Sequence, residues 1–203
     1  MPTALIYSDE LMKYELSKEH PLNQIRLKLT YELIRSYGML SNLFLYNPNY
    51  ADEEKILLAH DKDYVDYVKE KSKSPEEDFL SSIYCLGTGD NPIFPGMYEA
   101  SSLHVGGTIL ACELVLDRKA EHSFFLGGGF HHAKKSNAWG FCIFNDIVIA
   151  IKYIKRKYGL KKIMYLDIDA HHCDGVQEAF YSDPTVLKVS FHESGETLFP
   201  GTG

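Results

Sequence analysis

Short apolar runs bounded by glycine, proline or charged residues recur along this chain and predict buried β-strands. They lie at residues 3–7, 123–126, 163–166 and 185–191. The run at 123–126 is stopped by Gly127-Gly128-Gly129, which is typical of a parallel strand that leads into an irregular loop.

Longer segments between these runs predict helices. They lie at residues 22–37, 97–117 and 145–158. In 145–158 the apolar residues recur at helical spacing and basic residues gather near the C-terminal end, where cations are favoured. The order over residues 123–166 predicts a right-handed βαβ unit whose two strands are neighbours in one parallel sheet. Ligand sites of such sheets lie at the carboxyl ends of the strands.

Polar side chains collect at those two strand ends. Side chains two residues apart in an extended segment share a face, so Asp167, Asp169 and His171 are expected to point the same way. A carboxylate and an imidazole suit a zinc site of mixed oxygen and nitrogen ligands. His131-His132 could face this cluster as acid and base. A lone Asp-x-His is most often only a polar loop, but the convergence of these residues with Asp174 predicts metal-assisted hydrolysis.

The glycine run does not indicate nucleotide binding. Neither the dinucleotide pattern GxGxxG nor the phosphate-loop pattern GxxxxGK[ST] occurs in the chain. The polar cluster, rather than the glycines, therefore carries the chemical prediction.

Two stretches resemble the histone deacetylase superfamily, most closely its acetoin-utilisation-type prokaryotic members. They are GGGFHHAKKSNAWGFCIFNDIVIAI and YLDIDAHHCDGVQEAFYSDPTVLKVSFHESGETLFPGTG. The resemblance extends upstream through LGTGDNPIFPGMYEASSLHVGGTILA to EHPLNQIRLKLTYELI, and so covers nearly the whole chain. It implies an α/β fold with an open, mainly parallel sheet and helices on both faces. It also implies zinc-dependent hydrolysis of an acyl amide, typically on an acetylated lysine or amine.

The resemblance assigns roles to individual residues. Asp169 and His171 match the first two zinc ligands. His131 and His132 match the tandem catalytic histidines, with Asp167 and Asp174 as the carboxylates behind them. The positions that match the substrate site are Asp90 at the rim, Gly140 beside the tunnel wall, and Phe141 and Phe199 as the paired aromatics. The positions that match a site for a monovalent cation such as K⁺, held largely by backbone carbonyls, are Asp167, Asp169, His171, Ser190 and Phe191.

The chain also departs from the family pattern. Cys173 stands in place of a glycine, and its preferred interpretation is a small buried residue rather than a thiol near zinc. Trp139 stands in place of a small residue, which predicts a narrower or differently shaped tunnel mouth. The family's third zinc ligand, an aspartate, and its transition-state tyrosine lie further downstream than Gly203. We therefore expect a catalytic domain that is incomplete at its C-terminus and is completed by a companion chain or by self-association.

Composition bounds the remaining possibilities. The 203 residues suffice for one sizeable core, and without repeats or linkers we expect a single domain over 1–203. The net charge of −7 argues against a nucleic-acid partner. Four cysteines without a CxxC pair, and no secretory leader, predict a reducing cytoplasmic setting. No apolar run reaches the roughly 18 residues of a membrane helix.

Three functional hypotheses follow from the sequence. The first is a zinc-dependent deacetylase acting on acetyl-lysine or a small acetylated amine. The second is a module that has lost catalysis but still binds acyl-lysine or a partner. The third is an arginase-like hydrolase with two metal ions, although the tandem histidines argue against it.

Overall fold

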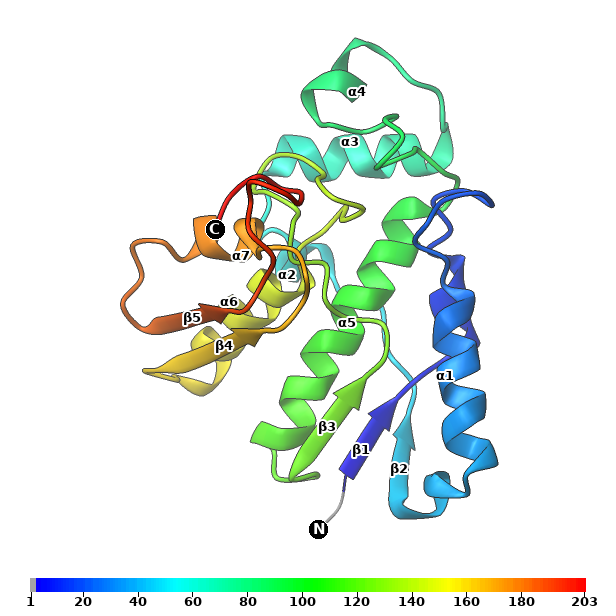
Figure 1. The fold of residues 1–203 in the computed structure, drawn as a ribbon, viewed down its shortest axis with the longest axis vertical. Coiled ribbons are helices and arrows are strands. Elements are labelled where there is room, and N and C mark those ends of the chain that lie inside the picture. The colour runs from blue at the N-terminus through cyan, green and yellow to red at the C-terminus, as the bar shows by residue number, and fades with distance from the viewer. Residues whose placement is uncertain (1–2) are drawn as a thin grey trace.

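The structure, a computed structural model, describes residues 3–203 (Figure 1). The elements are β1 (Thr3–Ile6), η1 (Asp9–Lys13), α1 (Ile25–Ser36), η2 (Met39–Asn42), β2 (Leu43–Tyr46), α2 (Glu53–Ile56), α3 (Lys62–Lys73), α4 (Phe79–Ile83), α5 (Met97–Leu116), β3 (His122–Phe125), α6 (Asp146–Tyr158), β4 (Ile163–Asp167), α7 (Asp174–Ala179) and β5 (Val186–Ser190). Among these described residues, no helix has the length and apolarity needed to cross a membrane.

The first sheet contains three parallel strands in the order β2-β1-β3. Different helices cover its two faces. Successive side chains of β1 point to opposite faces, so each face has its own contacts. Ala4 and Ile6 pack against Leu114 of α5. On the opposite face, Tyr7 stacks on Tyr31 of α1 with 4.2 Å between ring centroids. The predicted fold class, a parallel open sheet with helices on both faces, is confirmed.

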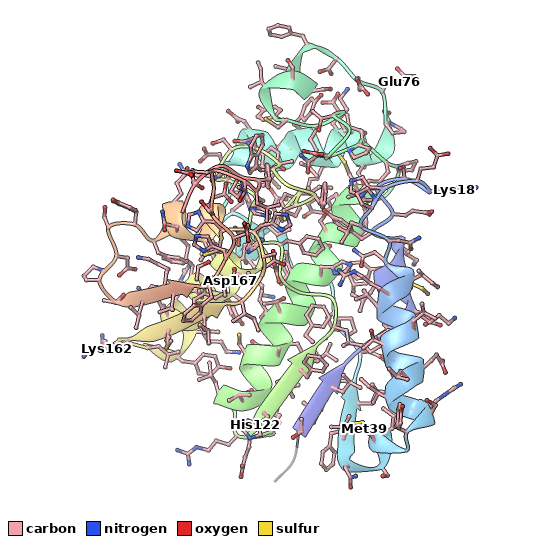
Figure 2. All side chains as sticks on the ribbon, viewed as in Figure 1. Lys18, Met39, Glu76, His122, Lys162 and Asp167 are labelled. Atoms are coloured by element: carbon pink, nitrogen blue, oxygen red, sulfur yellow. The ribbon has the colours of Figure 1, made fainter. Side chains whose placement is uncertain are left out.

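The second sheet pairs β4 with β5 in parallel, with Asp167 opposite Ser190 at its carboxyl end. Figure 1 shows it apart from the first sheet, with α6 and α7 beside it. Figure 2 places Lys162 at the outer start of this sheet and Asp167 near the middle of the molecule. The polar end of β4 therefore points toward the interior.

The prediction that β3 and β4 are neighbouring strands was wrong. In the described chain β3 is hydrogen-bonded only to β1, and β4 only to β5. Residues of α5 and α6, including Val105, Ile109 and Ile149, share the largest hydrophobic core. Local periodicity identified both strands and the helix between them. It could not show whether the crossover skips strand positions, because pairing is a long-range property.

Most other elements lie within a few residues of the prediction. The helix expected from residue 22 begins at Ile25, because the Leu22 backbone N–H is bonded to His20 Nδ1 and the Ile25 N–H to Asn23 Oδ1. The short elements that were not predicted have six residues or fewer and so are too short to show a repeating pattern: η1, η2, β2, α2, α4 and α7.

Candidate active site

A cavity of about 590 Å³ lies at the carboxyl ends of β3 and β4. It is lined by Leu22, Arg26, Asp90, Gly128, Gly129, Phe130, His131, His132, Gly140, Phe141, Cys142, Tyr165, Asp167, Asp169, His171 and Phe199. The two strand ends meet at this cavity although the strands are not paired. The expectation that polar residues from both ends converge is therefore met without the predicted βαβ unit.

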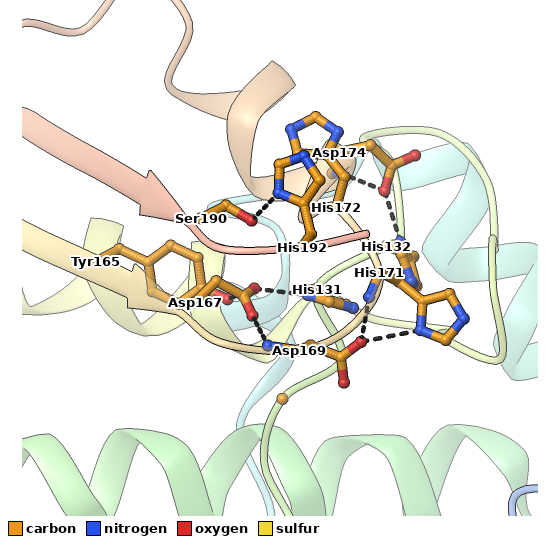
Figure 3. Close-up of polar contacts among 12 residues, drawn as sticks. His131, His132, Tyr165, Asp167, Asp169, His171, His172, Asp174, Ser190 and His192 are labelled. Carbon is orange, nitrogen blue, oxygen red and sulfur yellow. Dashed lines mark hydrogen bonds and ion pairs between the residues drawn. The ribbon is translucent and has the colours of Figure 1, made fainter. Parts of the chain in front are cut away.

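His131 is backed by Asp167 (Figure 3). Its Nδ1 lies 2.7 Å from Asp167 Oδ2, and the Tyr165 hydroxyl donates to the same oxygen. Asp167 Oδ1 accepts the backbone N–H of Asp169 at 2.9 Å. Burial alone would raise the pKa of the Asp167 carboxyl, but these three hydrogen bonds outweigh it and lower the pKa to about 2. Asp167 is thus an acceptor only, so His131 donates to it through Nδ1–H.

His132 is backed by Asp174 in the same way. Its Nδ1 lies 2.6 Å from Asp174 Oδ1. The other carboxylate oxygen, Oδ2, pairs with the Lys134 ammonium at 2.8 Å. Hydrogen bonds from His132 and Lys134 outweigh the effect of burial and hold the pKa of the Asp174 carboxyl below its usual value. Burial lowers the pKa of His132 although the hydrogen bond to Asp174 opposes it, so the neutral ring is favoured at pH 7.

The loop that carries both histidines is held by Asn145 and Asp146, at the N-terminal end of α6. Asn145 caps the helix through Oδ1, and its side-chain NH₂ donates to the carbonyls of His131 and Ala133. The buried Asp146 carboxylate accepts the backbone N–H of Gly129 and of Phe130. The histidines are therefore held by a helix N-terminus as well as by their own carboxylates.

Asp169 and His171, the predicted zinc ligands, lie side by side. Asp169 Oδ1 lies 2.9 Å from His171 Nδ1, and both side chains line the cavity. Two atoms bound to one tetrahedral zinc ion at about 2.0 Å would lie about 3.3 Å apart, so this donor pair fits a shared zinc ion with little adjustment. Within residues 3–203, no group of three or more His, Cys, Asp or Glu side chains is arranged to hold a metal ion.

A tight turn forms one wall of the cavity. Trp139 and Cys142 exchange backbone hydrogen bonds at 3.0 Å, and Gly140 and Phe141 between them have φ of +52° and +70°. A Cβ on Gly140 would lie 2.6 Å from the His132 ring and 2.8 Å from Phe199, so only glycine fits there. The ring of Phe199 packs against Trp139, with ring centroids 5.4 Å apart.

The remaining predicted residues lie at the edges. Asp90 lines the cavity, and its backbone carbonyl lies 3.2 Å from His20 Nε2. Ser190 and Phe191 lie outside the cavity lining: Ser190 Oγ is bonded to His192, and the Phe191 N–H donates to the Asp167 carbonyl. Cys173 is buried and free, as its preferred interpretation required.

Sequence reasoning missed four side chains that contact the site. Tyr165 and Lys134 bond the two supporting carboxylates, and Asp146 supports the glycine loop. Arg26 lines the cavity from α1. Tyr165 could have been found from its place two residues before Asp167, on the same face of the strand. The other three depend on tertiary contacts that carry no local signal.

Known proteins match the chain along nearly its whole length. The family model of the histone deacetylase domain matches residues 20–203. Acetoin utilization protein AcuC of Bacillus subtilis is 45% identical over 203 residues, covering 99% of this chain and 52% of the relative. AcuC of Staphylococcus aureus (strain MRSA252) is 40% identical over 201 residues, covering 99% of this chain and 51% of the relative.

Solved structures of HDAC homologs also match the chain. The crystal structure of an HDAC homolog complexed with SAHA matches with a TM-score of 0.83 at 36% identity, covering 98% of this chain and 53% of that one. The HDAC homolog from Aquifex aeolicus matches with the same values. The chain belongs to the histone deacetylase family. It spans about half the length of the curated relatives it matches.

Proposed function

We propose that this chain contributes the acid–base pair and two metal ligands of a zinc-dependent deacetylase site. The substrate would be an acyl amide, either acetyl-lysine or a small acetylated amine. One observation carries the proposal: the carboxylate-backed His131 and His132 line the same cavity as the adjacent Asp169 and His171. Membership in the histone deacetylase family supports the same reaction class.

Asp169 and His171 would hold the zinc ion together with ligands from polypeptide additional to these 203 residues, either continuous with this chain or a companion. When bound, zinc would supply Lewis-acid polarisation of the acyl carbonyl and of the attacking water. The third ligand and the hydroxyl donor expected from the family would come from that additional polypeptide. A single adjacent ligand pair favours a mononuclear site over an arginase-like dinuclear one.

His132 is the proposed general base. Its neutral ring presents a free Nε2, because Asp174 holds the Nδ1 proton. Nε2 takes a proton from water as the water oxygen attacks the acyl carbon. The same proton then passes from the imidazolium to the nitrogen of the departing amine as the C–N bond breaks. The products are an amine and a carboxylic acid, which exchange the remaining proton to become an ammonium and a carboxylate near pH 7. The ring centroid of His131 lies 4.0 Å from that of His132, and His131 would stabilise the charge that develops during this proton transfer.

The walls of the cavity fit the proposed substrate. The acyl-lysine stem is a narrow, uncharged chain, and Phe141 and Phe199 would line its path. Asp90 would accept hydrogen bonds from the substrate backbone at the rim. Trp139 packs against Phe199 and would shape the entrance.

The first test is His132→Ala in the protein assembled with its additional polypeptide. We expect hydrolysis of an acetyl-lysine peptide to fall by about 100-fold or more, because general acid–base catalysis contributes about 10²–10⁴ in rate. Zinc content should not change. His122→Ala is the matched control, because His122 is exposed at the start of β3 (Figure 2). Unchanged turnover in the His132 variant would reject the assignment.

A further inference from the structure

The two histidine–aspartate pairs differ in the third group that holds the carboxylate. Asp167 shares Oδ2 between His131 and the neutral hydroxyl of Tyr165. Asp174 instead accepts His132 Nδ1 and the backbone N–H of Gly175 at Oδ1, at 2.6 and 2.9 Å, while Oδ2 pairs with the Lys134 ammonium at 2.8 Å. One catalytic pair is thus completed by a phenol and the other by a cation.

Lys134 reaches Asp174 from a fixed piece of backbone. Its own N–H donates to the carbonyl of Asn137 at 3.0 Å, and the preceding carbonyl, of Ala133, is held by Asn145. The Lys134 side chain is only 19% exposed and that of Asp174 only 8%. The contact is therefore shielded from water and salt, unlike an ordinary surface ion pair.

We propose that Lys134 is a positioning residue for His132. A carboxylate held only at Oδ1 can rotate about its Cβ–Cγ bond, whereas an ammonium on Oδ2 fixes its plane. The fixed plane directs Oδ1 at His132 Nδ1, and so sets the ring orientation and the Nδ1–H tautomer. A bond between two charged groups is stronger than a neutral one, which suits this task. The consequence for turnover rests on the proposed function, but the contact itself does not.

The neighbouring lysine, Lys135, carries the same charge but does not contact Asp174. Lys135 has the same side chain, but its ammonium pairs with Asp61 at 2.7 Å and is 71% exposed. Lys134 also lies 3.2 Å from Glu178, whose side chain is 64% exposed, so that second contact is largely screened. Lys135 is therefore a matched control with the same change in net charge.

The test is nuclear magnetic resonance of the histidine rings in the 203-residue chain, without metal or substrate. His131→Gln and His132→Gln assign the Nδ1 protons. In Lys134→Gln we expect the His132 Nδ1 proton signal to move or to broaden beyond detection, with the His131 signal in place. Lys134→Arg should restore it, and Lys135→Gln should leave both signals unchanged. A His132 signal unaltered by Lys134→Gln, or altered equally by Lys135→Gln, would overturn the proposal.

A second measurement needs no substitution, in case Lys134→Gln fails to fold. In the unaltered chain the Lys134 ammonium protons should exchange slowly with water and give a detectable ¹⁵N-correlated signal, because they are held by a buried carboxylate. An ammonium that exchanges as fast as that of Lys135 would also overturn the proposal. Neither measurement involves turnover, so loss of the deacetylase assignment and loss of the positioning role are distinguishable.

Discussion

At the scale of single residues, the histidines differ in whether the ring lines the cavity, since His60, His104 and His132 are all buried but only His132 lines it. His104 on α5 is 1% exposed, with Nδ1 2.6 Å from the Gly127 carbonyl and Nε2 3.1 Å from that of Leu11. His60 is also buried, and its Nε2 accepts the backbone N–H of Asn145. Desolvation lowers the pKa of both rings to about 4. These are structural histidines, whereas His132 keeps a free nitrogen in the cavity.

The two structural histidines predict a pH-dependent stability. The unfolded chain binds a proton at each ring below about pH 6.5, but the folded chain does so only near pH 4. The unfolded state therefore binds more protons between these values, and the free energy of unfolding should fall as pH drops from 6.5 toward 4. The expected slope is on the order of 1 kcal/mol per pH unit for each ring. Urea unfolding at pH 7 and pH 5 measures it.

His104→Gln separates this effect from other titrations. The variant should be less stable at pH 7, because a buried packing and hydrogen-bonding group is changed, but its stability should depend less on pH. His122→Gln changes an exposed histidine and should keep the full slope. Equal free energies of unfolding at pH 5 and pH 7 would contradict the prediction, because they would mean that the folded chain takes up as many protons as the unfolded chain over this range.

At the scale of elements, the sequence predicted what repeats locally and missed what depends on distant contacts. The helix at 145–158 was recognised from its spacing, and α6 spans Asp146–Tyr158 with Gly159 in the left-handed conformation at its end. The pairing of β3 and β4 was predicted wrongly, because a helical connection does not fix how far apart its strands lie. Most polar residues of the cavity were predicted from their place at the strand ends, and the wall residues Gly140, Phe141 and Phe199 from the family resemblance. Lys134 and Arg26 required the folded chain.

At the scale of the whole molecule, the second sheet has an uncovered apolar face. Met164 and Leu187 are partners in the β4–β5 register and are 59% and 58% exposed, and Leu166 is 52% exposed. Within residues 3–203 the only strand bonded to β4 is β5. A contiguous apolar face of this kind marks an interaction surface. We expect additional polypeptide to cover it, in keeping with relatives about twice as long.

This predicts that the isolated 203-residue chain associates through that face. Met164→Lys combined with Leu187→Lys should lower the associated fraction, because the charges cannot be buried against another apolar surface. Light scattering coupled to size-exclusion chromatography measures the fraction. The control replaces Phe79, which is 81% exposed on α4, with lysine and should leave association unchanged. A native chain that is wholly monomeric would contradict the prediction.

The central claim is that the cavity supports zinc-dependent amide hydrolysis, and metal removal tests it most directly. The measurement is acetate release from an acetyl-lysine peptide by the protein with its additional polypeptide, before chelation, after chelation and after zinc is restored. The account predicts that release stops on chelation and returns with zinc, but does not return in Asp169→Ala, which lacks one of the two proposed ligands. Release that continues unchanged in the chelated protein, or that zinc restores fully in Asp169→Ala, would contradict it.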